Sequence, residues 1–210
     1  MELIAVVVVI FSIILHEVAR GYVANWLGDP TAKYAGRLTL NPVPHIDMVG
    51  SIIVPGLALL SNSPFLLGWA KPVPVNPYNL RYGKWGEALT ALAGPGTNIA
   101  IAAIAGLAVR FGGPAFATTE VLSFVLTVII ANISLAVLNM LPIPPLDGSK
   151  VVAALLPPGL YMQYRELENL TYALGPFGLI LVLILIVNFL SAPMGILTYT
   201  IFSVLTGVPI

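Results

Sequence analysis

Long apolar blocks alternate along the chain with short polar stretches that are rich in proline and glycine. The first block carries no charge from Leu3 to Leu15 and, read as a helix, continues to Trp26. An α-helix rises ~1.5 Å per residue, so about 20 apolar residues cross the ~30 Å hydrocarbon core of a bilayer. Four more blocks approach or exceed that length, at 85–111, 120–140, 171–190 and 193–208. The pattern predicts an all-α polytopic membrane protein with five to six transmembrane helices, folded as a single domain over residues 1–210.

A shorter apolar block and two polar stretches separate the first two long blocks. Residues 48–60 are apolar but are interrupted by Pro55-Gly56, which suits a short tilted span or a re-entrant segment. Before this block, residues 34–40 predict a short strand after the first helix. After it, alternate prolines within residues 68–77 enforce an extended chain, whose carbonyl groups cannot face lipid. We expect this extended segment at the membrane interface or over a cavity.

Composition supports a membrane protein and narrows its chemistry. The chain has 58% hydrophobic and 9% charged residues, against ~25% charged in soluble proteins, and its mean hydropathy is +0.96. We therefore expect a multi-pass protein with the lipid bilayer as a partner. Nine basic and nine acidic residues balance, and no basic patch argues for nucleic acid. Cysteine is absent, so any metal must use nitrogen and oxygen ligands.

His16 and Glu17 stand deep within the first apolar block, where ionisable side chains are costly and mark a functional-site hypothesis. The sequence His-Glu-x-x-His on a helix binds Zn²⁺ through two imidazoles, with the glutamate as general base. This chain has Arg20 at the second histidine position, and a guanidinium has no lone pair for a metal. The residues alone leave two interpretations open: a zinc site, or a Glu17–Arg20 ion pair with His16 bonded to a neighbouring helix. In either case Arg20 needs an acidic partner at this depth.

Two later stretches place polar groups within apolar sequence. Residues 94–98 (Gly-Pro-Gly-Thr-Asn) either pack tightly around a kink or present Asn98 and freed backbone groups to a ligand. Asp147 follows a helix broken by three prolines, which makes it a candidate metal ligand or proton relay. The alternative is a cap for the short helix that follows it. Because buried ionisable groups need partners, we expect the side chains of His16 and Asp147 to lie within ~5 Å of each other.

As a set, these stretches resemble the site-2 protease family of intramembrane zinc metalloproteases. The resemblance lies in three motifs: His16-Glu17-Val18-Ala19 with Gly21-Tyr22, residues 94–98, and Asn139 through Leu146-Asp147-Gly148. The sequence between them, including Ala70-Lys71-Pro72-Val73-Pro74-Val75, is similar to the small prokaryotic branch, which has no PDZ or CBS domain. The resemblance covers about residues 10–155 and leaves the helices expected over 171–210 outside it.

The resemblance implies a site, a cofactor and a substrate class. His16 matches the first zinc ligand, Glu17 the general base and Asp147 the third protein ligand. Four positions match the residues that hold an unwound substrate strand: Gly94, Pro95, Asn98 and Asn139. The implied cofactor is Zn²⁺, and the implied partner is a transmembrane segment of a membrane-protein substrate. The implied activity is hydrolysis of peptide bonds within that segment, as regulated intramembrane proteolysis in a prokaryotic cell membrane.

Position 20 departs from the family pattern, which has histidine where this chain has Arg20. We rank three accounts in this order: an inactivating substitution in an intact fold, a pseudoprotease that binds membrane segments without cutting them, and His45 as a substitute ligand. A guanidinium near Zn²⁺ repels the ion in a low dielectric, which weakens the last account. A further function class, a small ion or proton transporter using the same ionisable residues, lacks the internal repeat typical of many transporters.

Overall fold

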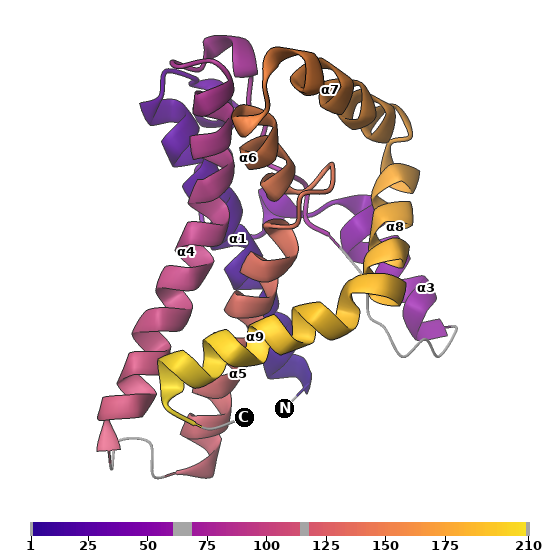
Figure 1. Cartoon of the computed structure of the whole chain (residues 1–210). Helices are drawn as coiled ribbons and strands as arrows, with labels where there is room; N and C mark the ends of the chain where they lie inside the picture. The colour runs from indigo at the N-terminus through magenta and orange to yellow at the C-terminus, as the bar shows by residue number, and fades with distance from the viewer. Residues whose placement is uncertain (1, 61–68, 114–117, 209–210) are drawn as a thin grey trace.

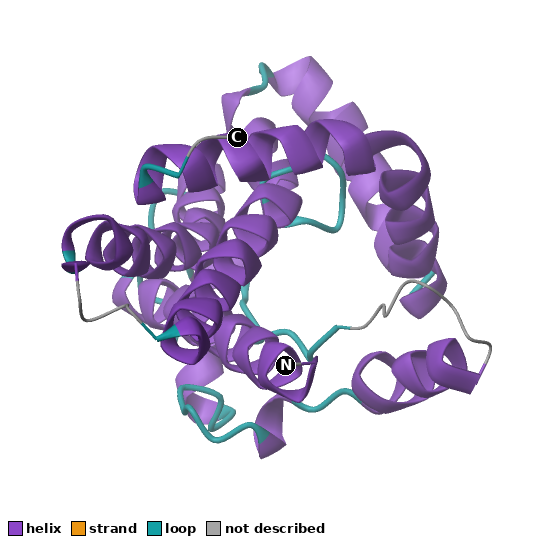
Figure 2. Ribbon diagram, turned by 90° about the horizontal axis from the view of Figure 1, so that it is seen from below, coloured by secondary structure: helices purple, strands orange, loops and turns teal. Residues whose placement is uncertain are grey.

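The computed structural model describes residues 2–60, 69–113 and 118–208, and every regular element in these ranges is helical (Figures 1 and 2). The long helices are α1 (Glu2–Trp26), α4 (Lys84–Phe111) and α5 (Thr119–Asn139). The shorter helices are α2 (Thr31–Tyr34), α3 (Val54–Leu60), α6 (Asp147–Leu155), α7 (Pro158–Ala173), α8 (Pro176–Leu185) and α9 (Ser191–Thr206). Short 3₁₀ or π segments are η1 (Val43–His45), η2 (Met48–Ile53), η3 (Pro77–Asn79) and η5 (Ile186–Leu190).

By length and composition, four helical segments of the described chain suit a membrane span: Ile4–Trp26, Lys84–Phe111, Thr119–Asn139 and Pro176–Thr206. The predicted all-helical membrane protein is confirmed, but with four such segments in place of five to six. The last two expected spans form one helical segment that changes direction at η5 (Figure 1). Pro193 does not separate them, because it lies in the first turn of α9, where its missing N–H removes no helical bond. The apolar block at 48–60 is helical but too short to cross a bilayer.

The strand expected over residues 34–40 is wrong, because this part of the chain closes on itself through local hydrogen bonds. Tyr34 is the last residue of α2. The next three main-chain N–H groups, from Ala35 to Arg37, donate back to the carbonyls of residues 31–33 at 3.0 Å. Gly36 has a φ of +64°, the left-handed conformation that follows many helix ends. The backbone groups that a neighbouring strand would need are therefore already used.

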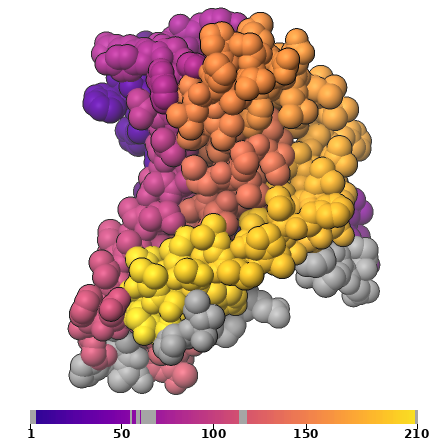
Figure 3. Space-filling view, viewed as in Figure 1, coloured from indigo at the N-terminus to yellow at the C-terminus, as the bar shows by residue number. Residues whose placement is uncertain are grey.

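The long helices α1, α4 and α5 pack against one another, and α9 crosses α4 and α5 on the face seen in Figure 3. Between α4, α5 and α9 the core is apolar, with Ala102, Ile129 and Ile133 fully buried. Gly106 allows α9 to come close, because a Cβ at this position would lie 2.8 Å from the Cβ of Leu205. Helices in lipid associate through such close packing of small residues and through hydrogen bonds between helices.

The extended segment formed by residues 69–76, here called the proline strap, connects back to α1 before the chain enters α4. As the alternate prolines predict, it forms no helix. Its main-chain N–H groups have four acceptors: Gly50 O for Trp69 (3.1 Å), His45 O for Lys71 (2.9 Å), the Glu17 carboxylate for Val73 (2.7 Å) and the Asp29 carboxylate for Asn76 (2.6 Å). The strap is therefore bound along its length to α1 and to the loop that follows α1.

Asp29 anchors the far end of the proline strap. Its side chain is fully buried and accepts hydrogen bonds from Thr31, from the main-chain N–H of Asn76 at 2.6 Å and from the side chain of Asn79 at 3.1 Å. Burial by itself raises the pKa of this carboxyl group. The hydrogen bonds from Thr31, Asn76 and Asn79 outweigh burial and hold the pKa of Asp29 below its usual value.

We expect the anchoring by Asp29 to be lost in acid. A carboxyl group with a lowered folded-state pKa stabilises the fold above its unfolded pKa of ~3.9, and the stabilisation disappears as pH falls through the folded-state value. Hydrogen exchange of the Asn76 amide, corrected for its intrinsic rate, should therefore accelerate at pH values below ~3.9. In Asp29→Asn the amide should exchange quickly at every pH, without the acid-dependent step. An identical step in both proteins would contradict this role of Asp29.

Candidate functional site

His16 of α1 and Asp147 of α6 are in contact, although 131 positions separate them in the sequence. His16 Nε2 lies 2.9 Å from Asp147 Oδ2, and the two side chains are only 5% and 4% exposed. The prediction that these groups lie within ~5 Å of each other is confirmed. Asp147 is the first residue of α6, and that helix has no side-chain cap. The contact with His16, and not capping, therefore accounts for the direction of the Asp147 side chain.

Arg20 bridges the two carboxylates of the site. Its Nη1 lies 3.3 Å from Glu17 Oε1, and its Nε lies 3.3 Å from Asp147 Oδ1. The expectation that Arg20 points to an acidic partner is confirmed, and both nearby carboxylates serve. The second oxygen of Glu17 accepts the main-chain N–H of Val73 at 2.7 Å. This donor cannot be found from the sequence, because a main-chain N–H is common to almost every residue and leaves no signal in the pattern.

Buried amide side chains continue from His16 into the bundle. Asn98 Oδ1 lies 2.7 Å from His16 Nδ1, and Asn98 Nδ2 lies 2.8 Å from Asn132 Oδ1. Asn132 Nδ2 in turn lies 2.9 Å from both Ser12 Oγ and the Val128 carbonyl oxygen. Asn98 was a candidate from its sequence motif, but the motif does not connect it with His16, Ser12 or Asn132. The available signal was the spacing of Asn132 and Asn139, which stand seven residues apart and therefore on one face of α5.

The four positions matched to substrate binding have different surroundings. A Cβ at Gly94 would collide with His16 Nε2, so glycine is needed for the ring to occupy its place. Pro95 is buried beside it, and Asn98 has no exposed surface. Asn139 is half-buried and donates to the Leu135 carbonyl of its own helix at 2.9 Å. Gly94 and Asn98 support His16 directly, whereas the Asn139 side chain bonds only its own helix within the described residues.

His45, considered as a substitute ligand, belongs to the loop between α1 and α4. Its Nε2 lies 2.9 Å from the Thr39 carbonyl oxygen, and its own carbonyl accepts the Lys71 N–H at 2.9 Å. Within residues 2–60, 69–113 and 118–208, no three histidine, aspartate or glutamate side chains form a group able to hold a metal. His45 therefore does not complete a ligand set with His16 and Asp147.

The donors present at the site do not fit a protease zinc centre. Such a centre uses three protein ligands and leaves a fourth position open. Here His16 and Asp147 converge, but Arg20 contacts Asp147 and carries a permanent charge without a lone pair. The geometry corresponds to the ion-paired arrangement that the residues alone allow. No metal-dependent step follows for the unaltered chain.

A second charged cluster lies one helical turn further along α6. Lys150 pairs with the buried side chain of Glu168, and Arg165 joins Glu168 at 2.7 Å to Glu87 of α4 at 3.2 Å. Burial lowers the pKa of Lys150 to about 8, and the nearby charge of Arg165 acts in the same direction. The sequence alone does not reveal this cluster, because inward and outward charges look alike until the helices are packed.

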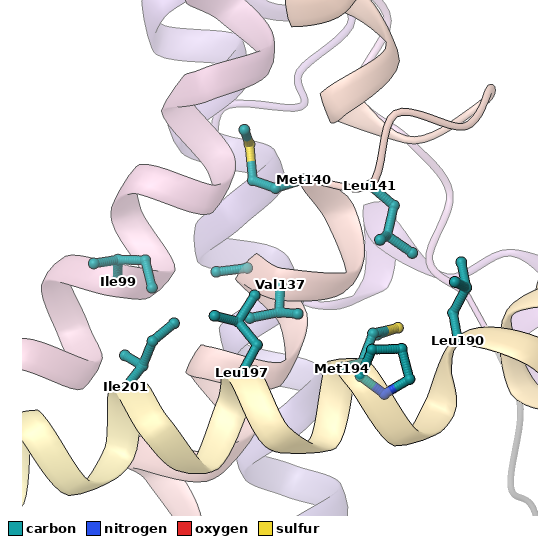
Figure 4. Close-up of a pocket in the computed structure, with 10 residues that line it drawn as sticks. Ile99, Val137, Met140, Leu141, Leu190, Met194, Leu197 and Ile201 are labelled. Atoms are coloured by element: carbon teal, nitrogen blue, oxygen red, sulfur yellow. The ribbon is translucent and has the colours of Figure 1, made fainter.

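An apolar pocket of about 360 Å³ lies between α4, α5 and α9 (Figure 4). Side chains from the three helices face one another across it, including Ile99, Val137, Met194 and Leu197. One lining residue, Ile99, directly follows Asn98 in the sequence of α4. No ionisable residue lines it, and it is therefore distinct from the chemistry of His16 and its partners.

Comparison with known proteins agrees with the resemblance found in the motifs. Residues 106–185, which include Asp147, match the model of peptidase family M50. The chain is 34% identical over 189 residues to YwhC of Bacillus subtilis, named as a candidate zinc metalloprotease, and the match covers 87% of this chain and 80% of that protein. It is 30% identical over 140 residues to Rip2 of Mycolicibacterium smegmatis, named likewise, with 66% and 52% covered. No solved structure gave a significant match. The chain belongs to peptidase family M50, the site-2 protease family of metalloproteases.

Proposed function

We propose that this chain has the architecture of an intramembrane zinc metalloprotease and that Arg20 impairs its activity. One observation carries the proposal: His16, Glu17 and Asp147 converge, and Arg20 is paired with both carboxylates. His16, Glu17 and Arg20 belong to a helix that suits a membrane span. The substrate class is a transmembrane segment, since a site at this depth meets peptide bonds that lie within the bilayer. The family relationship supports the zinc-dependent reaction but says nothing of position 20.

Glu17 is the proposed general base of the reaction. A carboxylate in this role takes a proton from the attacking water and passes it to the leaving amine. In the unaltered chain Oε1 is paired with Arg20, and Oε2 accepts the Val73 N–H. Removing the guanidinium would free one oxygen for the water, while the bond from Val73 would still hold the carboxylate in place.

The substrate must be unwound where it is cut, because a helix shields its own peptide bonds. We propose that the extended strand lies beside the proline strap and α4, near Gly94, Pro95, Asn98 and Asn139, which match the family's strand-holding residues. The position of the strap, bonded through Val73 to Glu17, supports this location. The amide of Asn98 is occupied by His16 and Asn132, so its contribution in this state is to hold the histidine.

A second candidate function is a membrane-segment binder that does not cut. The ion pairs of Arg20 favour it, because they place a cation between both carboxylates without a metal. The two candidates differ in one measurable property, which is whether restoring a histidine at position 20 restores the enzyme.

We expect Arg20→His to bind about one zinc ion per chain and to cleave a helical membrane substrate, because it supplies the third ligand and removes the repelling charge. Zinc would be measured by metal analysis of protein purified in detergent, and cleavage with tagged transmembrane segments. Arg20→Gln is the matched control: it removes the charge without adding an imidazole and should bind no zinc. Adding Glu17→Ala to Arg20→His should keep the metal and abolish cleavage, because a base and not a ligand is lost.

Each alternative outcome of this experiment has a distinct meaning. Arg20→His protein without zinc would show that the fold does not carry the proposed centre. Bound zinc without cleavage of any segment would favour the membrane-segment binder. Equal cleavage by the unaltered chain would mean that another group replaces the missing ligand and that Arg20 does not impair activity.

Gly94→Ala should weaken zinc binding in the Arg20→His protein, because the added methyl group would displace His16 Nε2. A loss of ~10–100-fold in zinc affinity is typical when the support of a ligand is disturbed. The matched control is Gly96→Ala on the same helix, since a Cβ there has no neighbour within 4 Å. Competition with a chelator of known affinity would measure both variants. Equal zinc affinity in the two would contradict the steric role of Gly94.

A further inference from the structure

Four polar side chains form a continuous buried path across three helices. Ser12 and His16 come from α1, Asn98 from α4 and Asn132 from α5, and all four residues are buried. The path is closed by contacts of 2.7–2.9 Å: His16 to Asn98, Asn98 to Asn132, and Asn132 to Ser12. Polar groups so deeply buried are retained where every donor meets an acceptor.

The donor and acceptor of each hydrogen bond in this path follow from the bond between Asn132 and the Val128 carbonyl. A main-chain carbonyl oxygen can only accept, so the Asn132 atom that lies 2.9 Å from the Val128 carbonyl must be its amide nitrogen. The Asn132 oxygen must then face Asn98, which has to present its own nitrogen. The Asn98 oxygen is therefore turned toward His16 Nδ1, 2.7 Å away. An oxygen acceptor there requires a proton on Nδ1.

A second carbonyl supports the same orientation of Asn98. Its nitrogen also lies 3.4 Å from the main-chain oxygen of Ser12, which again can only accept. Turning the Asn98 amide over would set two oxygens against each other at Asn132 and leave His16 Nδ1 facing an N–H group. The Ser12 hydroxyl can rotate and fits either direction, so it does not decide the orientation.

We propose that Asn132 is a positioning residue that acts through Asn98 to keep an oxygen acceptor, and hence a proton, at His16 Nδ1 while the ring presents Nε2 to Asp147. The Asp147 carboxylate, 2.9 Å from Nε2, is an acceptor as well, so a proton on Nδ1 is not an alternative to one on Nε2. Among the residues that the structure describes, the Asn132 side chain bonds Asn98, Ser12 and Val128 and not Asp147 or Glu17, so its effect on the site passes through the Asn98 amide. A histidine that binds a metal through one nitrogen usually donates its other N–H to an oxygen, which fixes the ring. The catalytic meaning of this role rests on the proposed function, but the position of the proton does not.

His45 is the only other histidine in the sequence and serves as an internal reference when the proton position on His16 is measured. His45 Nε2 lies 2.9 Å from the Thr39 carbonyl oxygen, an acceptor, so His45 carries its proton on Nε2. The structure thus assigns an Nδ1 proton to His16 and an Nε2 proton to His45. With two imidazole rings in the chain, the nitrogen signals of His16 and His45 can be told apart by substituting His45 alone.

The experiment is ¹⁵N nuclear magnetic resonance of the unaltered chain, labelled at histidine and held in detergent micelles. We expect a protonated Nδ1 for His16 and a protonated Nε2 for His45, read from the pattern of ring nitrogen shifts and couplings. An unprotonated Nδ1 on His16 would overturn the proposal. This first measurement needs no metal and no substitution in the buried path, because only the assignment uses a His45 variant, so it decides the matter even where a chain altered in the path does not fold.

Asn132→Leu should then change the His16 Nδ1 signal and leave that of His45 unaltered, because Asn98 loses the partner that fixes its direction. Asn188→Leu is the matched control: Asn188 makes the same bond to the carbonyl four residues earlier, Ile184, but is exposed and bonds no histidine in the described part of the chain. An unchanged His16 signal in Asn132→Leu, or an equal change in Asn188→Leu, would contradict a positioning role.

A zinc titration separates this inference from the proposed function. In the Arg20→His protein, Asn132→Leu should lower zinc affinity by ~10–100-fold, as is typical when the hydrogen-bond partners of a ligand are lost. Unchanged affinity would contradict the positioning role. Failure of Arg20→His itself to bind zinc would contradict the proposed function, and the nitrogen spectrum of the unaltered chain would still test the proton on His16.

Discussion

Asp147 is a carboxylate at the start of α6, after a proline-rich turn and within apolar sequence, and burying such a charge is costly unless it is paired. Its two oxygens meet His16 Nε2 and Arg20 Nε, both from α1. This requirement brings the first residue of α6, a helix that packs against α4, to α1 across 131 positions of sequence. The position of the Asp147 loop, the direction of Arg20 and the closeness of Glu17 all depend on it.

The surrounding helices are shaped to admit the histidine that Asp147 contacts. On α4, Gly94 leaves room for the ring and Asn98 faces its second nitrogen. On α5, Asn132 holds Asn98. Hydrogen bonds between helices and small residues at their contacts are the main means of association in lipid, and here the same contacts orient one side chain. Stability and site geometry are therefore supplied by the same residues.

The sequence predicted those features that follow from a strong local physical requirement. It did not predict those that depend on how the helices pack. Cost of burial predicted that His16 and Asp147 would meet, and alternate prolines predicted the extended strap. The strand after the first helix was wrong because local bonds from Ala35 to Arg37 satisfied the backbone first. The link from Asn98 to Asn132 depends on the rotation of α4 relative to α5, which periodicity within each helix does not determine.

The contact between Val73 and Glu17 has a consequence for how the protein tolerates sequence drift. The donor is a main-chain N–H, so the identity of the side chain at position 73 does not enter the bond. Nineteen of the twenty amino acids supply the same group, and proline alone removes it. With prolines already at positions 72 and 74, this N–H is the one amide donor in the centre of the strap. The hydrogen bond to Glu17 thus comes from the backbone and does not depend on which side chain stands at position 73, proline excepted.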